Sequence, residues 1–193
     1  QIDSYERDPK KVKEGLEKVQ KDMAIMYQKI VDAGFEDIKE SGIKDRHFII
    51  IDEAADLADD SKCMEIVTDI ARRGRGAGYY LVYATQYPSA QSIPQQTKRN
   101  IPVRLSYVLD DAIASNTALG QTGAELLPMI PGRGIYKNVK TQIIQSPYIS
   151  NKQITERIKP HIIIRPREEK DDGQKTDSKT AENRQHSIVL EKV

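Results

Sequence analysis

The stretch that decides the fold is Phe48-Ile49-Ile50-Ile51-Asp52-Glu53, in which four apolar residues are followed by two acids. An unbroken, β-branched apolar run is typical of a strand that is buried on both faces, as strands are in the parallel sheets of α/β proteins. Open α/β sheets bind ligands at the carboxyl ends of their strands, which is where the two acids stand. The stretch therefore predicts a buried strand that presents two carboxylates at a ligand-binding edge.

An apolar strand that ends in two acids has the pattern of a Walker B motif. A carboxylate at this place can hold Mg²⁺, usually through water, beside the phosphates of a nucleotide. A second carboxylate beside it can orient or deprotonate the attacking water. On this interpretation Asp52 is the metal residue and Glu53 is the catalytic base. The alternative is that the two acids only cap the helix that follows.

A second buried strand is predicted over residues 79–84, and it ends in Thr85 and Gln86. A polar residue at the end of a neighbouring strand can reach the γ-phosphate of a nucleotide or the attacking water. We therefore assign Thr85 and Gln86, together with Asp52 and Glu53, to an ATP-binding edge, and we assign Gln86 to a sensor role. The alternative is a polar strand end that hydrogen-bonds only to nearby backbone.

Upstream of these strands, residues 9–33 are predicted to form one long amphipathic helix. Asp8 is expected as its N-cap, Pro9 as its first residue and Gly34 as its stop. Its apolar residues alternate at spacings of four and three, which places them on one stripe. These residues are Val12, Leu16, Val19, Met23, Met26, Ile30 and Ala33. We expect the stripe to pack on the sheet or on another domain, and a self-associating coiled coil is the alternative.

Further elements alternate along the chain. They are a helix over 61–73, a third strand over 103–108, helices over 110–119 and 150–158, and an antiparallel pair over 135–137 and 141–146. Strands that alternate with helices predict an α/β fold with a mainly parallel sheet and flanking helices.

The chain divides into three regions by composition. Residues 1–47 are expected to be the long helix and its connector, 48–160 the core with the Walker B pattern, and 161–193 a polar, flexible tail. Within this tail, residues 187–190 could add one short strand or bind in a groove.

The composition excludes several classes of protein. Thirty basic and 29 acidic residues give a net charge of +1, so a global basic field for nucleic acid is absent, although a local patch is open. The single cysteine, Cys63, excludes an intrachain disulfide and favours a reducing, cytoplasmic compartment. The three histidines show no spacing typical of a zinc site. No apolar run approaches the ~18 residues of a membrane span, and no signal peptide is evident.

Six blocks of the sequence, in the same order and with similar gaps, resemble the motor domain of the FtsK/SpoIIIE DNA translocases. The resemblance covers roughly residues 10–150. The blocks are 48–57 (FIIIDEAADL), 70–78 (IARRGRGAG), 81–89 (LVYATQYPS), 98–105 (KRNIPVRL), 115–119 (SNTAL) and 123–127 (GAELL).

This resemblance implies a P-loop NTPase core of the RecA-like, additional-strand type. It also implies that the intact protein is an ATP-driven DNA pump, a homo-oligomeric and hexameric ring with ATP between its subunits. Asp52 would then hold Mg²⁺, Glu53 would activate water and Gln86 would sense the γ-phosphate. Arg75 would lie near a subunit boundary, so we assign it as the arginine finger that stabilises charge on a neighbour's γ-phosphate.

Other basic residues compete for these roles. Arg73, Arg99 and Arg104 are rivals of Arg75 as the finger. Lys98, Arg99 and Arg104 lie near a loop that could face a central pore, where they would contact DNA phosphates regardless of sequence. Ordinary surface charge is the alternative for all of them.

The late stretch Ile130-Pro131-Gly132-Arg133-Gly134-Ile135-Tyr136 departs from the cell-division translocases. It is more similar to the conjugative-element members, which pump plasmid or transposon DNA to a recipient. Secretion ATPases of the same superfamily have similar Gly-Arg-Gly segments, so a type VII-like ATPase that moves protein is an alternative. The intact protein is expected at the cytoplasmic face of the membrane, with any membrane anchor outside this chain.

One expected element is missing. A P-loop needs Gly-x-x-x-x-Gly-Lys-Ser/Thr, and no Gly-Lys pair occurs in the 193 residues. The family places its P-loop upstream of the segment that corresponds to residue 1. We therefore expect a motor truncated on its N-terminal side, and negligible ATPase activity from this chain alone. A catalytically inactive paralogue is the alternative, and the ordered blocks argue against a generic small α/β binding domain.

Overall fold

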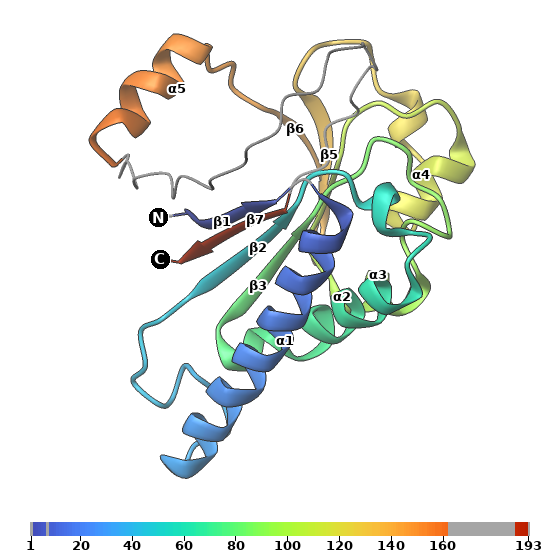
Figure 1. Ribbon diagram of the computed structural model, residues 1–193. Helices are drawn as coiled ribbons and strands as arrows, with labels where there is room; N and C mark the ends of the chain where they lie inside the picture. Colours follow the sequence, from blue (N-terminus) through green and yellow to red (C-terminus); the bar gives the residue numbers. More distant parts are fainter. Residues whose placement is uncertain (1, 7, 162–187, 193) are drawn as a thin grey trace, which may run out of the picture.

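The computed structural model describes residues 2–6, 8–161 and 188–192 and has a four-stranded sheet at its centre (Figure 1). The order of its strands is β1 (Ile2–Glu6), β7 (Ile188–Lys192), β2 (His47–Ile51) and β3 (Tyr79–Tyr83). The two strands predicted from their apolar runs are thus neighbours in space. Their carboxyl ends lie at the same edge of the sheet, because β2 and β3 are parallel.

Helices α1 (Pro9–Asp32) and α2 (Ser61–Arg73) pack side by side over one face of this sheet (Figure 1). The Asp8 carboxylate caps α1 by accepting hydrogen bonds from the backbone N–H groups of Lys10 and Lys11. The stripe predicted for this helix is buried except for Ala33, which lies just past the helix end and is exposed. The buried residues of the stripe are Val12, Leu16, Val19, Met23, Met26 and Ile30.

This burial decides between the two alternatives for the long helix. The stripe joins a single core with the inward residues of α2, β2 and β3, among them Ile49, Ile51, Ile66 and Ile70. Each fully buried aliphatic side chain contributes about 1.5–3 kcal/mol, which attaches α1 firmly to the sheet. The helix therefore packs within the chain, as expected.

The sheet is mixed, so the expectation of a mainly parallel sheet is wrong, although the α/β class is confirmed. β7 runs antiparallel to β2, and β1 runs antiparallel to β7. The place beside β2 is filled by a strand from the far end of the chain. Within the described residues no βαβ crossover connects that strand to β2, so nothing there requires it to be parallel.

The predicted third strand, over residues 103–108, joins a second sheet instead. It forms β4 (Arg104–Ser106), which pairs antiparallel with β5 (Arg133–Lys137), and β5 pairs antiparallel with β6 (Thr141–Gln145). The antiparallel pair expected for β5 and β6 is confirmed. A hairpin needs only a short turn, so this pair forms locally and offers β4 an edge outside the main sheet.

The remaining elements are short. They are η1 (Ala54–Leu57), η2 (Gly74–Ala77), α3 (Gln95–Asn100), α4 (Ala112–Leu119), η3 (Ala124–Leu126), α5 (Asn151–Ile158) and η4 (Lys159–His161). Helix α5 stands apart from the main sheet in Figure 1 and buries none of its residues. Among the described residues, no helix is long and apolar enough to cross a lipid bilayer.

The strand expected near residues 187–190 is confirmed as β7, so the end of the predicted tail belongs to the sheet. Residues 162–187 and 193 of that tail lie outside the described residues. The division into three regions stays a prediction.

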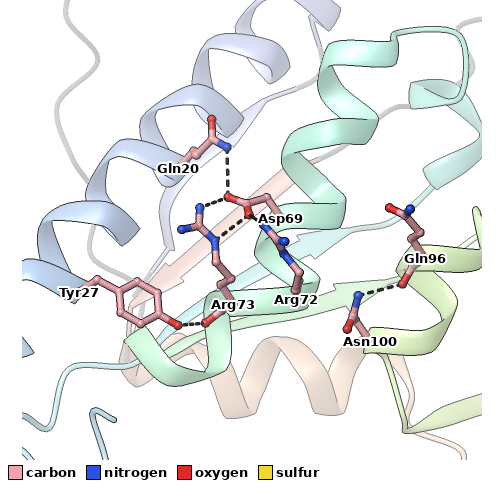
Figure 2. A network of polar contacts seen from close by, with 7 residues as sticks. All are labelled: Gln20, Tyr27, Asp69, Arg72, Arg73, Gln96 and Asn100. Atoms are coloured by element: carbon pink, nitrogen blue, oxygen red, sulfur yellow. Dashed lines mark hydrogen bonds and ion pairs between the residues drawn. The ribbon is translucent and has the colours of Figure 1, made fainter. Parts of the chain in front are cut away.

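A polar network joins α1 to the end of α2 (Figure 2). The Asp69 carboxylate accepts hydrogen bonds from Gln20 Nε2 at 3.2 Å, Arg72 Nη2 at 3.0 Å and Arg73 Nε at 2.7 Å. The Tyr27 hydroxyl donates to the carbonyl of Arg73. Hydrogen bonds from the Arg73 guanidinium are the main reason that the pKa of Asp69 is lowered to about 2.

Replacement of Asp69 by Asn is expected to cost about 1–2 kcal/mol of unfolding free energy at pH 7. The lowering of the Asp69 pKa to about 2 corresponds to at most about 2.5 kcal/mol, and the expected cost is smaller because water screens Arg72, which is 65% exposed, and Arg73, which is 46% exposed. Since folding lowers this pKa, the stability is present above about pH 4 and is lost as the pH falls toward about 2. Denaturant unfolding between pH 2 and 7 measures both effects, and the variant should lose less stability in acid than the parent.

Glu65 is the matched control for this prediction, because its side chain is 71% exposed and its carboxylate lies 3.6 Å from Lys62 Nζ. Replacement of Glu65 by Gln should change stability by less than about 0.5 kcal/mol. Equal unfolding curves for the two variants would contradict the role given to Asp69.

Candidate functional site

The edge at which β2 and β3 end brings the predicted site residues together. In the parallel register Ile51 lies opposite Tyr83, and the pairing continues beyond the strands. The N–H of Ala84 donates to the carbonyl of Ile51, and the N–H of Ala54 donates to the carbonyl of Ala84, both at 2.8 Å. The residues that directly follow each strand are therefore held side by side by backbone hydrogen bonds.

Glu53 is the centre of the site. Its Oε1 accepts a hydrogen bond of 2.6 Å from the Thr85 hydroxyl and one of 3.2 Å from the N–H of Ala55. Its Oε2 accepts a hydrogen bond of 3.0 Å from the N–H of Gln86. Glu53 thus caps η1, as the alternative interpretation expected, and also contacts the end of β3, which a cap alone does not require.

The other predicted residues of this edge are open to solvent. Asp52 is exposed beside the half-buried Glu53, and the side chain of Gln86 is exposed as well. Mg²⁺ is usually held by one or two carboxylates, with water and phosphate oxygens as its other ligands. An exposed Asp52 at a strand end suits that kind of site. Among the described residues, no group of three or more acidic, His or Cys side chains forms a preassembled metal cage.

Arg75 lies at the other end of the sheet. It is exposed in η2, which precedes β3, whereas Glu53 lies where the strands end. The five residues of β3 between these two ends span about 16 Å at about 3.3 Å per residue. Arg75 and Glu53 of one chain therefore cannot act on the same phosphate.

The turn that carries Arg75 is closely packed. The N–H of Ile38 donates to the carbonyl of Gly76, and the N–H of Gly78 donates to the carbonyl of Arg75. A Cβ atom at Gly76 would lie 2.6 Å from the Tyr27 hydroxyl, so a larger residue there would displace that side chain. The neighbouring rival Arg73 is bound to Asp69 by an ion pair.

The predicted nucleic-acid residues differ from one another in the structure. The guanidinium of Arg104 donates to the carbonyls of Lys98 at 2.7 Å, Leu119 at 2.9 Å and Ile101 at 3.3 Å. Arg104 therefore ties three backbone segments together. This geometry favours a structural role for Arg104 over contact with DNA phosphates. Arg99 is exposed, and its side chain makes no hydrogen bond or ion pair within the described residues.

Lys98 is half buried beside the same segments. Its Nζ donates to the carbonyl of Asn116 at 2.7 Å, near the end of α4. Burial, followed by the charges of Arg104 and Lys137, lowers the pKa of Lys98. The sequence analysis missed Lys137, whose Nζ donates to the carbonyl of Leu119 at 2.9 Å. Three cations thus surround the end of α4, where the helix dipole favours positive charge.

Replacement of Arg104 by Ala is expected to destabilise the chain by about 2 kcal/mol, because a charged donor leaves partly buried carbonyl groups. The matched Arg99→Ala variant should change stability by less than about 0.5 kcal/mol. Denaturant unfolding of the two variants measures the difference. If the two variants were equally stable, the hydrogen bonds of Arg104 would not stabilise the fold, and Arg104 would be an ordinary surface cation.

Comparison with curated proteins shows several relatives. The chain is 37% identical over 128 residues to the DNA translocase FtsK of Caldanaerobacter subterraneus subsp. tengcongensis, a match that covers 62% of this chain and 18% of the relative. It is 30% identical over 178 residues to the DNA translocase SpoIIIE of Bacillus subtilis, with 81% of this chain and 22% of the relative covered. The chain spans about a fifth of the length of these relatives. No protein-family model matches the chain.

Solved structures agree with the fold. A monomer of the pCW3 conjugation coupling protein TcpA with ATPγS has a TM-score of 0.68 and 26% identity, and the match covers 78% of this chain and 49% of that chain. The cytoplasmic domain of the type VII secretion ATPase EccC of Thermomonospora curvata has a TM-score of 0.58 and 20% identity, over 66% of this chain and 16% of that chain. The likeness to EccC concerns the fold alone. The expected P-loop ATPase type of fold is confirmed.

Proposed function

The chain belongs to the FtsK/SpoIIIE family of DNA translocases, and from this premise we propose that it is the Walker B part of an ATP-driven motor that moves DNA. The observation that carries the proposal is the Glu53 carboxylate, held at the common end of two parallel strands by groups of the neighbouring strand. A helix cap alone would not need these contacts to β3. They suit a base that must keep one position beside a phosphate.

Each residue of the edge has a role in this proposal. ATP, when bound here, supplies the γ-phosphoryl group that water attacks. Asp52 holds Mg²⁺, usually through water, and Glu53 accepts the proton of the attacking water. The exposed amide of Gln86 orients that water or the γ-phosphate. The Gly-Lys pair that a P-loop needs is absent from the 193 residues, so a Walker A segment outside them completes the phosphate site.

The position of Arg75 supports a shared site. Since Arg75 lies at the sheet end opposite to Glu53, it can serve only the site of another subunit. We therefore propose a homo-oligomeric ring, hexameric as the resemblance implies, with ATP at its subunit interfaces. The motor would work at the cytoplasmic face of the membrane, with any membrane anchor outside this chain.

The cargo is proposed to be DNA, in double- or single-stranded form. Both curated relatives are named DNA translocases, and the structural neighbour TcpA is named a conjugation coupling protein, which supports transfer of DNA between cells. Exposed Arg99 is the proposed phosphate contact. Lys98 would also contact phosphate, but only with the Nζ protons that are not used in its hydrogen bond to the carbonyl of Asn116.

A secretion motor that moves protein is the second candidate, because the fold of EccC is similar. Steady-state phosphate release by the intact motor, with and without duplex and single-stranded DNA, separates the two functions. A DNA translocase should be stimulated by DNA, and the stimulation should fall steeply with salt. Hydrolysis that DNA does not change would favour the secretion motor. No hydrolysis under any condition would favour an inactive paralogue.

A further inference from the structure

We propose that Thr85 is a positioning residue for Glu53 and not a ligand of the nucleotide. Its hydroxyl keeps the Glu53 carboxylate turned so that one lone pair of Oε2 faces the attacking water. This inference rests on the proposed function, because it names what holds the proposed base in place.

The hydrogen bonds to Glu53 leave one place free. A carboxylate has two oxygens and about four lone-pair positions. On Glu53, Oε1 accepts from Thr85 Oγ1 and from the N–H of Ala55, and Oε2 accepts from the N–H of Gln86. The remaining lone pair belongs to Oε2. A water proton can therefore be accepted at that oxygen without breaking a contact.

The Thr85 hydroxyl has no proton left for a phosphate. A hydroxyl carries one donor, and Thr85 donates it to Glu53 at 2.6 Å, a length typical of a hydrogen bond to a carboxylate. The carbonyl of Tyr87, at 3.5 Å, is too distant to compete. The oxygens of a fully ionised triphosphate accept hydrogen bonds and donate none. Thr85 could contact such a phosphate only by releasing Glu53.

The loop after β3 fixes the orientation of this hydroxyl. Thr85 Oγ1 accepts a hydrogen bond of 3.3 Å from the N–H of Tyr87. The carbonyl of Tyr87 in turn accepts from the hydroxyl of buried Ser92 at 3.1 Å. The Tyr83 hydroxyl donates to the carbonyl of Ser92 at 2.7 Å, and this bond attaches the far end of the loop to the last residue of β3. The position of the base is thus tied to the closed loop 85–92.

The experiment compares Thr85→Val, which keeps the shape without the hydroxyl, with Thr85→Ser, which keeps the hydroxyl. Both changes are made in the intact, DNA-stimulated motor. Thr85→Val should lower kcat about 10–100-fold and leave the KM for ATP within about twofold, because only the orientation of the base is lost. Thr85→Ser should keep kcat within about threefold of the parent. Thr141→Val, at an exposed position of β6, is the control for the same substitution away from the site. It should leave kcat and the KM for ATP at their parental values.

A double variant separates positioning from nucleotide binding. In the Glu53→Gln background, Thr85→Val should cause no further loss of single-turnover hydrolysis, because there is no base left to orient. The inference is overturned if Thr85→Val keeps kcat, or if it weakens ATPγS binding in both backgrounds, as a direct ligand would. If Glu53→Gln alone keeps the parental kcat, the proposed base itself is wrong, which is a different result.

Discussion

Glu53→Gln is expected to lower the kcat of the intact motor at least about 100-fold, with ATP binding preserved. Glutamine has nearly the same shape, and its one carbonyl oxygen can still accept the hydrogen bond from the Thr85 hydroxyl, whereas the NH2 group that replaces the other oxygen cannot accept from the N–H of Gln86. It cannot take a proton from water, so only the chemical step is lost. Steady-state phosphate release measures the loss, and equilibrium binding of ATPγS shows that the site still forms.

The matched control for Glu53→Gln is Glu65→Gln on the exposed face of α2, which should retain parental turnover. A parental kcat in the Glu53 variant would remove Glu53 from the role of base. Loss of both turnover and ATPγS binding would also count against it, because a base contributes to the chemical step more than to nucleotide binding.

Arg75→Ala is expected to lower hydrolysis about 10³-fold, and only in the assembled ring, because arginine fingers stabilise the transition-state charge of a neighbour's site. The side chain is exposed, so its removal should leave the fold and the nucleotide affinity of single subunits unchanged. Turnover is measured as a function of protein concentration, with assembly followed by light scattering. Arg157→Ala, on exposed α5, is the control and should have no such effect.

Mixed rings test whether the finger acts between subunits. Glu53→Gln subunits keep Arg75, and Arg75→Ala subunits keep Glu53, so some interfaces in a mixed ring regain both groups. Mixing the two inactive proteins should therefore restore part of the hydrolysis. Full activity of Arg75→Ala rings would assign the finger to another arginine, and Arg99 is the rival whose exposed side chain makes no hydrogen bond or ion pair within the described residues.

Local patterns predicted the elements that carry the site. The β-branched run before Asp52 and the apolar stripe over residues 9–33 each mark one element within a short window, so β2 and α1 were predicted nearly to their ends. The sequence analysis treated β2 and β3 as neighbours in a nucleotide-binding sheet, and the structure confirms that they pair. The polar residues after each strand then had to share one edge.

Other features depended on contacts between distant segments. The basic residues before and within β4 suggested a phosphate contact, but Arg104 binds the carbonyls of Lys98, Ile101 and Leu119 instead. Lys137 was missed because nothing near it in the sequence indicates the end of α4 as its partner. A lysine or arginine looks the same in a sequence whether it faces water or caps a helix from another element.

The sequence by itself determined the strands, the long helix and the acidic and polar residues at the strand ends, because short-range periodicity and turn chemistry specify such elements. Only the tertiary structure decided that β7 fills the place beside β2, that β4 joins a second sheet, and that Thr85 is bonded to Glu53. Glu53 and Thr85 are 32 positions apart in the sequence, and β7 and β2 are still farther apart. Which distant groups meet is set by the packing of the whole core, and no local pattern contains that information.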